Sequence, residues 1–226
     1  MSTLRPARPE DLPAIARLSH RTLLLGREGH GVFPSQELWG ELFVAPYLRQ
    51  GCCSFVAEAE GEVVGYILGA CATLPLALDL ALHLPLLLLR LLLGGYGPRL
   101  PHLRYLLRLL LYPGPKAPRR LYPAHLHIAV DPKAQGQGLG KALLVAFLEC
   151  LRARGVPGVQ LSTTRANRAA RELYRSLGFR LHAKRASPFW APYRGRPAIH
   201  EVWVKELGGV GEGALKERAS RRCRWP

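Results

Sequence analysis

The sequence lacks the patterns in which cysteine usually binds metal or builds a disulfide framework. Its five cysteines are an odd number, include no CxxC pair and have no metal-ligand spacing with histidine. They are Cys52, Cys53, Cys71, Cys150 and Cys223. We therefore expect free thiols in a cytoplasmic protein, and we predict no metal site.

Long, uninterrupted apolar runs are also missing. Residues 1–16 carry four charged residues and three prolines, so they contain no apolar core of a signal peptide. Residues 74–111 are rich in leucine but are interrupted by charged residues, proline and glycine. Such broken runs predict no transmembrane span. Packing on the core or a homodimer is the expected use of this segment, and contact of its basic, leucine-rich helices with a membrane interface is the alternative.

Acidic residues are scarce, with 16 Asp and Glu against 32 Lys and Arg and a net charge of +16. This charge attracts polyanions such as nucleic acid, an anionic membrane or a phosphorylated cofactor. Nucleic-acid binding is disfavoured, because the sequence has no RNP-like aromatic motif, zinc knuckle or recognisable helix-turn-helix. Part of the charge falls in residues 208–226, which we predict to be a basic, flexible tail.

The periodicity of apolar residues predicts an α+β fold in one domain over residues 1–207. The expected order is a strand at 4–7, helices from Pro9 and Ser35, a hairpin of 54–58 and 63–70, a strand at 125–130, a helix at 138–154, a strand at 159–162, a helix at 167–177 and a strand at 199–205. A central mixed sheet of about six to seven strands flanked by about four helices accounts for this order. Residues 74–122 form a leucine-rich insertion, with helices expected at 86–93 and 103–110.

A glycine-rich turn, Gln135 to Lys141, lies between the strand that ends at Val130 and the following helix. Its glycines, Gly136, Gly138 and Gly140, leave the backbone N–H groups open to a phosphate. The positive end of the helix dipole and the Lys141 ammonium favour an anion at the same point. The turn is not a P-loop, because no GK[ST] follows, and it is not the dinucleotide-binding fingerprint.

The turn resembles the acyl-CoA motif of the GCN5-related N-acetyltransferases (GNAT), [Q/R]xxGx[G/A], at Gln135, Gly138 and Gly140. A second family motif is matched by Asn167, Ala170, Tyr174, Gly178 and Phe179, and the resemblance extends to about Lys205 except over 74–122. It implies acetyl-CoA as co-substrate, with pantetheine on the backbone of Ile128, Ala129 and Val130. It also implies pyrophosphate on Gln135, Gly136, Gln137, Gly138, Leu139, Gly140 and Lys141, with Asn167 as a further contact.

The resemblance also suggests catalytic residues. Tyr174 stands where family members often keep a general acid for the leaving thiolate. His125 and His127 share one face of their strand and are the candidate general bases, with Glu58, Glu62 or a relayed water as alternatives. The HLH string resembles a paired-histidine strand of arylalkylamine acetyltransferases, but one residue fewer separates it from Asp131. That difference reverses the face unless a bulge restores it.

Two functions follow from this reading. The first is an acyl-CoA-dependent N-acetyltransferase that moves an acetyl group to an unidentified amine by direct attack. The second is a catalytically silent acyl-CoA sensor or docking module, because YPAHLHI with QGQGLG is also similar to the acetyltransferase-like domains associated with O-GlcNAc hydrolases. The sequence contains no pattern from which the chemistry of the acceptor amine can be inferred.

Overall fold

The computed structural model describes residues 2–24 and 32–208, and the predicted basic tail lies almost wholly outside the described residues. Seven strands form one sheet in the order β1-β2-β3-β4-β5-β7-β6. They are β1 (Ser2–Pro6), β2 (Phe55–Ala59), β3 (Glu62–Ala70), β4 (Ala124–Val130), β5 (Gly158–Thr164), β6 (Arg180–Ser187) and β7 (Ala198–Glu206). Only the β4–β5 pair is parallel. The predicted mixed sheet with a central parallel crossover is confirmed.

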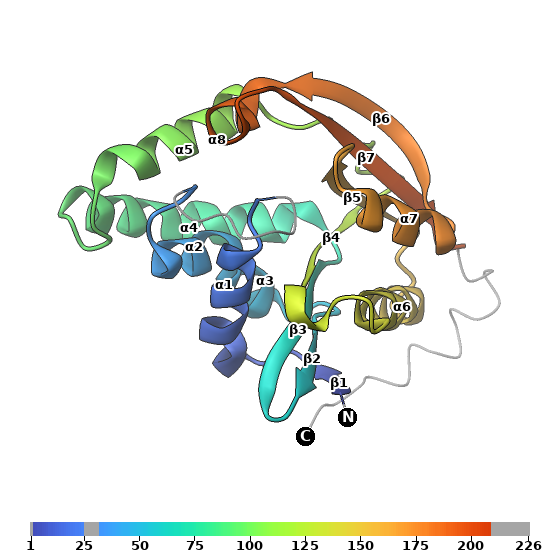
Figure 1. The fold of residues 1–226 in the computed structure, drawn as a ribbon. Helices are drawn as coiled ribbons and strands as arrows, with labels where there is room; N and C mark the ends of the chain where they lie inside the picture. Colours follow the sequence, from blue (N-terminus) through green and yellow to red (C-terminus); the bar gives the residue numbers. More distant parts are fainter. Residues whose placement is uncertain (1, 25–31, 209–226) are drawn as a thin grey trace.

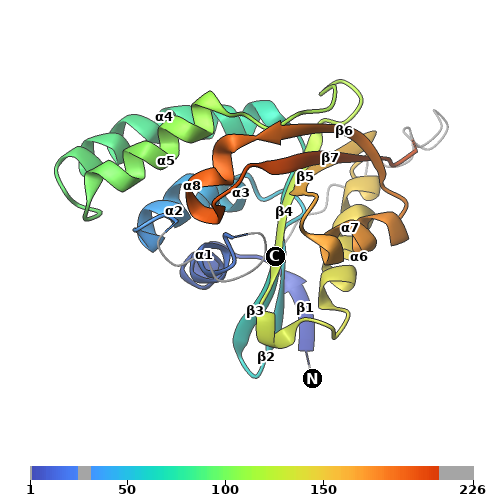
Figure 2. The same ribbon diagram turned by 45° about the horizontal axis from the view of Figure 1, so that its top comes forward.

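Helices cover both faces of this sheet (Figures 1 and 2). They are α1 (Leu12–Arg21), α2 (Gln36–Phe43), α3 (Ala45–Gln50), α4 (Thr73–Leu92), α5 (Arg99–Leu111), α6 (Leu139–Ala153), α7 (Arg168–Ser176) and α8 (Ala191–Arg194), with 3-10 turns η1 (Pro9–Asp11), η2 (Pro132–Ala134) and η3 (Pro188–Trp190). Helices α1, α2 and α3 lie on one side of β2–β4, and α6 lies on the other. The short helices α3 and α8 were not predicted.

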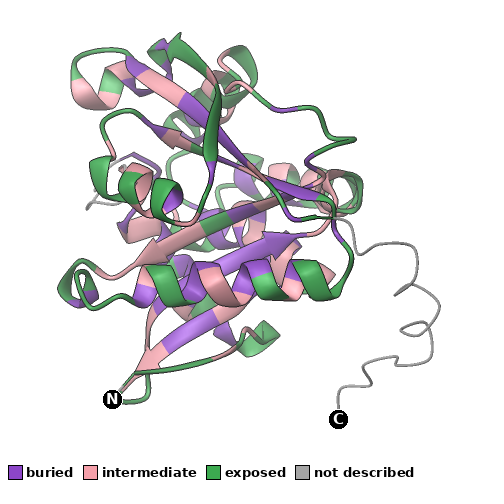
Figure 3. Ribbon diagram, turned by 90° about the vertical axis from the view of Figure 1, so that its right-hand side faces the viewer, coloured by how far each residue is buried: buried purple, intermediate pink, exposed green. Residues whose placement is uncertain are grey.

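The crossover from β4 to α6 forms because two apolar patterns meet. Leu126 on β4 is buried, and Ile128 and Val130 on the same face pack against the core that α6 covers. The stripe on α6 includes Leu143 and Phe147, both fully buried. Figure 3 looks onto this side, with the exposed face of α6 towards the viewer and buried strands behind it. The alternation in β4 therefore places its histidines on the opposite face, towards α1 and α3.

Local chemistry sets the ends of several elements as predicted. Glu60 (φ 53°) and Gly61 (φ 80°) make the tight turn of the β2–β3 hairpin. The Ser35 hydroxyl accepts from the Leu38 N–H at 3.1 Å and begins α2. The Asn167 side chain does the same for Ala170 at 3.2 Å and begins α7.

The parallel strands β4 and β5 pair only at their first residues. Ala124 lies opposite Val159 and His125 opposite Gln160, and their pairing ends there. On its other side, β4 stays paired with β3 from His125 to Val130. The β4 edge from 126 to 130 that faces β5 is therefore free of sheet partners within the described residues.

The leucine-rich insertion differs from the expectation. Instead of broken runs with a helix at 86–93, residues Thr73–Leu92 form one continuous helix, α4, with Pro85 inside it. Its polar residues find partners, because Asp79 pairs with Arg49 of α3 at 2.8 Å and its carbonyl contacts Nδ1 of His83 at 2.8 Å. The predicted helix at 103–110 is confirmed as α5. By length and composition, α4 could cross a membrane, so the argument from broken runs was wrong.

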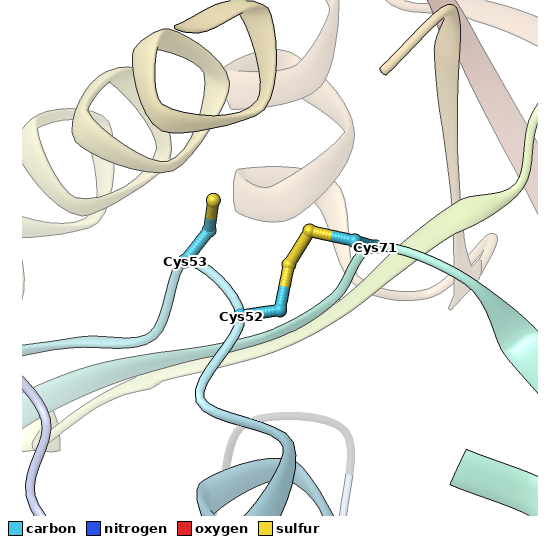
Figure 4. Close-up of side chains that lie close together, drawn as sticks. All are labelled: Cys52, Cys53 and Cys71. Carbon is cyan, nitrogen blue, oxygen red and sulfur yellow. A yellow bond between two sulfur atoms is a disulfide. The ribbon is translucent and has the colours of Figure 1, made fainter. Parts of the chain in front are cut away.

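The cysteines also differ from the expectation of free thiols. Cys52 is joined to Cys71 (Figure 4), so the loop before β2 is tied to the end of β3. Cys53 is joined to Cys150, which ties the same loop to α6. These bonds use four of the five cysteines, and the fifth, Cys223, lies outside the described residues. The sulfurs of Cys52, Cys53 and Cys71 lie within 4.8 Å of one another, but disulfide bonds occupy all three. The predicted cytoplasmic location relied partly on free cysteines, and the disulfides remove that support, so the location stays a prediction.

Candidate active site

The glycine turn presents unpaired backbone N–H groups at the start of α6. Gly136 and Gly138 both adopt φ +80°, a conformation that favours glycine. The Ala142 N–H donates to the Gly138 carbonyl at 3.0 Å. The N–H groups of residues 139–141 precede this bond and have no acceptor within the helix. The turn therefore combines free donors with the positive end of a 15-residue helix.

The predicted residues of the turn divide by what their side chains do. Those of Gln137 and Lys141 are exposed, and Leu139 is buried in the core, so Leu139 can offer a ligand only its backbone. The Gln135 side-chain amide donates to the Val130 carbonyl at 3.1 Å. Gln135 thus holds the turn against the end of β4, which makes the free strand edge continuous with the turn.

The histidines of β4 lie on the α1–α3 face, and no register shift interrupts the β3–β4 pairing. His127 is exposed, and its Nδ1 lies 2.9 Å from the Tyr66 hydroxyl of β3. His125 is half-buried, and its ring lies edge-on to Tyr47 of α3 at 5.6 Å. His125 also lies in the part of β4 that pairs with β5. Of the two, His127 is the one beside the free edge.

Known proteins match this chain in sequence and in fold. Residues 27–179 match the Acetyltransferase (GNAT) family. The chain belongs to this family. Proteins of the family use acetyl-CoA, so the predicted co-substrate agrees with the family.

Solved structures with this fold cover nearly the whole GNAT chain. SsHAT is 27% identical with a TM-score of 0.61, over 92% of this chain and 98% of its own. The ribosomal-protein-S18-alanine N-acetyltransferase from Escherichia coli is 22% identical with a TM-score of 0.57, over 94% and 97%. A phosphinothricin acetyltransferase from Sinorhizobium meliloti in complex with AcCoA is 22% identical with a TM-score of 0.58, over 92% and 90%. The last two likenesses show the fold alone.

Curated relatives match a much shorter part. A mycothiol acetyltransferase of Thermomonospora curvata is 50% identical over 56 residues, 25% of this GNAT chain and 19% of the relative. One of Acidothermus cellulolyticus is 53% identical over 53 residues, 24% and 16%. The matched segment thus spans less than a fifth of each relative.

The protein around the two histidines of this GNAT site holds them neutral. Desolvation by the surrounding protein lowers the pKa of His127 from 6.5 to about 4, although its side chain keeps access to solvent. Desolvation and the nearby cations Lys116 and Arg119 lower the pKa of His125 to about 4. Both imidazoles are therefore uncharged near neutral pH, which is the form that accepts a proton.

Tyr174 lies on α7 with its ring buried against Phe179, at 5.9 Å between centroids. Burial raises the pKa of its phenol above 10, so the hydroxyl stays protonated at neutral pH. Asn167 begins the same helix, and its cap uses Oδ1, which leaves the side-chain Nδ2 for other contacts. The structure thus places two residues of the second motif on one element, with Asn167 at the N-cap of α7 and Tyr174 within the helix.

Several polar residues of the site gave no signal in the sequence. Tyr66 contacts His127 because of the β3–β4 register. It lies opposite Ala129, which is two residues after His127 on the same face of β4. Thr164 lies opposite His200 in the β5–β7 pair, on the face of the sheet that carries the histidines. Thr164 Oγ1, His200 Nε2 and Arg21 Nε are buried without a hydrogen-bond partner in the part of the chain that the structure describes.

A cavity of about 450 Å³ lies elsewhere, between α5 and α8. Its lining includes Arg104, Arg108 and Tyr193, and its residues come from neither β4 nor the glycine turn. The candidate site therefore rests on the strand edge and the turn.

Proposed function

We propose that this chain is an acetyl-CoA-dependent N-acetyltransferase that acetylates an amine by direct attack. The observation that carries the proposal is the free edge of β4, which runs into the open N–H groups at the start of α6. An extended amide chain pairs with a strand edge, and a pyrophosphate binds at a helix N-terminus. The acyl-CoA arm has both chemical features in this order.

The residues present fit that cofactor. The backbone of Ile128, Ala129 and Val130 borders the free edge and would pair with the pantetheine arm. The N–H groups from Gly136 to Lys141 would hold the pyrophosphate, with the exposed Lys141 as a counter-charge. A Cβ placed on Gly136 or Gly138 meets nothing within 4 Å in the protein itself, so the turn leaves room for a ligand. The Asn167 Nδ2 group would supply a further donor.

His127 is the proposed general base. It is neutral, open to solvent and adjacent to the free strand edge. When Nδ1–H donates to the Tyr66 oxygen, the lone pair on Nε2 is left for the substrate. The neutral amine nitrogen then attacks the thioester carbonyl carbon, and Nε2 takes the proton that the nitrogen loses. We assign His125 to packing against Tyr47, and we retain it only as the second candidate base.

Tyr174 is the proposed general acid. As the carbon–sulfur bond breaks, the sulfur takes the bonding electron pair and needs a proton. A phenol held protonated by burial can donate it. The proton taken by His127 and the proton given by Tyr174 balance, so the enzyme returns to its starting state once solvent exchanges the two.

The acceptor is an amine that approaches the thioester from the histidine face of β4, where His127 is exposed. The named substrates of the relatives are not carried over, because the match covers under a fifth of those proteins.

The test is a titration of the purified full chain with acetyl-CoA, followed by free-thiol release with a panel of small amines, polyamines and peptides. Saturable binding together with amine-dependent thiol release supports the proposal. Binding without release from any amine identifies the silent sensor instead. Absence of acetyl-CoA binding would refute both functions.

A further inference from the structure

We propose that α4 and α5 form a docking surface for an anionic lipid bilayer, independently of the proposed enzymatic function. The two helices make a hairpin whose closed end points away from the sheet (Figures 1 and 2). Helix α4 has a mean hydropathy of 1.7 over its most apolar 18-residue window, yet only 11% of that window is buried. A continuous apolar surface that stays exposed on a folded domain marks an interaction site.

The exposed leucines of α4 lie on one stripe. They are Leu74, Leu78, Leu82, Leu86, Leu89, Leu92 and, at the helix C-cap, Leu93, and Leu82 and Leu93 keep 78% and 75% of their surface exposed. At about 100° per residue, their spacing of three and four keeps them on one side of the helix. The buried Leu87 and Leu91 lie on the opposite side and pack against α2 and its neighbours. The stripe is therefore a face that the protein's own core does not use.

Helix α5 is divided in the same way. His102 and Tyr105 are buried, and His102 Nε2 accepts from the Ser35 N–H at 3.0 Å, which fixes the inner side to α2. The outer side carries the exposed Leu100, Leu103 and Leu110, and next to them Leu107 and Leu111 are exposed where they line the cavity between α5 and α8. Each helix thus has an anchored inner side and an apolar outer side. Because the inner sides are held by the core, the hairpin offers its leucines to a bilayer surface and α4 does not cross the bilayer while the domain is folded.

The charge of the hairpin selects the partner. Residues 73–111 contain four arginines, Arg90, Arg99, Arg104 and Arg108, against a single acid, Asp79, which is already paired with Arg49. Lys116, Arg119 and Arg120 follow directly and are exposed. Two copies of this hairpin would bring like charges together, which opposes the homodimer. An anionic lipid surface complements the leucine stripe and the exposed Arg90, Arg99 and Arg104. Arg108 is already engaged, because it donates to the backbone carbonyls of Phe189 and Pro188.

The experiment is co-sedimentation of the full chain with vesicles of phosphatidylcholine alone or with one third phosphatidylglycerol. We expect binding to the anionic vesicles. Part of this binding should persist at high salt, because salt screens the arginines but not the inserted leucines. The triple variant Leu82→Gln, Leu86→Gln, Leu89→Gln should weaken binding by more than about 100-fold, since each buried CH₂ contributes about 0.8 kcal/mol. Arg90→Gln should weaken it about fivefold, the equivalent of about 1 kcal/mol per basic residue.

Leu121→Gln is the matched control, because Leu121 is 58% exposed but lies outside both helices. It should bind vesicles like the wild type, and thermal unfolding should show that all variants are folded. Equal binding by the triple variant would overturn the proposal, because the net charge alone then explains the attraction. No binding by wild type, or a dimer in light scattering that the triple variant breaks, would also overturn it. The dimer result would identify a second copy as the occupant.

Discussion

Alanine at Gly138 tests whether the glycine turn binds the cofactor or merely connects two elements. Gly138 has φ +80°, and alanine in the left-handed region costs about 1–2 kcal/mol of folding stability. In the protein alone, the added methyl meets nothing within 4 Å. It lies where the proposed pyrophosphate binds, and any change in φ turns the neighbouring N–H groups away. Loss of one charge-assisted hydrogen bond costs about 1.5–3 kcal/mol, which weakens acetyl-CoA binding about 10- to 150-fold.

Gly155→Ala is a matched control at the other end of the same helix. Gly155 has φ +68°, its added methyl also meets nothing within 4 Å, and it follows the C-terminus of α6. The 15-residue helix separates the two glycines by about 22 Å. Calorimetric titration with acetyl-CoA and thermal unfolding of both variants give the comparison. We expect similar losses of stability and a loss of binding in Gly138→Ala alone. Unchanged binding by Gly138→Ala, or equal losses in both, would refute the assignment.

Three further predictions concern the proposed catalytic residues and the disulfides. His127→Gln should lower kcat about 100-fold or more, and wild-type kcat/KM, expressed per neutral form of the acceptor amine, should fall only as the pH drops below 6.5 towards 4, because protonation of His127 removes the base; a fall in this corrected kcat/KM that is already complete above pH 7 in a pH–rate profile contradicts this. Tyr174→Phe should lower kcat at least about 100-fold in steady-state thiol release with the Kd for acetyl-CoA unchanged, and a changed Kd with normal kcat assigns the residue to packing instead. Cys53→Ser opens a loop of 97 residues and Cys52→Ser opens one of 19. In chemical denaturation, Cys53→Ser should therefore lower the free energy of unfolding by about 1.4 kcal/mol more than Cys52→Ser does. Equal stability of the wild type under reducing and oxidising conditions would argue against both bonds.

The sequence predicts the central part of the fold because there the local signals agree. The apolar alternation of 125–130, the glycine turn and the stripe of α6 each favour the same strand–turn–helix unit, and the structure confirms it. The insertion was harder to predict, because in the sequence alone the polar residues of α4 seem to interrupt its apolar pattern. Asp79 is compatible with a helix there only through Arg49, which lies 30 residues earlier in the chain. The disulfides were missed for a related reason, since the loop before β2 meets α6 only after the sheet has formed.

The orientation of the histidines shows how far the sequence could have been taken. Leu126, Ile128 and Val130 must face α6, because its apolar stripe follows directly in the chain and needs a partner. His125 and His127 then face the other way, towards α1 and α3, and no knowledge of relatives is needed to place them. What the pattern does not contain is the Tyr66 contact, which depends on the number of residues in the β2–β3 hairpin and on the register of β3 against β4. A shift of that register by one residue would turn the Tyr66 side chain to the α6 face and leave His127 Nδ1 without this partner. The proposed base is therefore positioned twice: its face comes from the apolar pattern of its own strand, and the partner of its Nδ1 comes from a neighbouring strand.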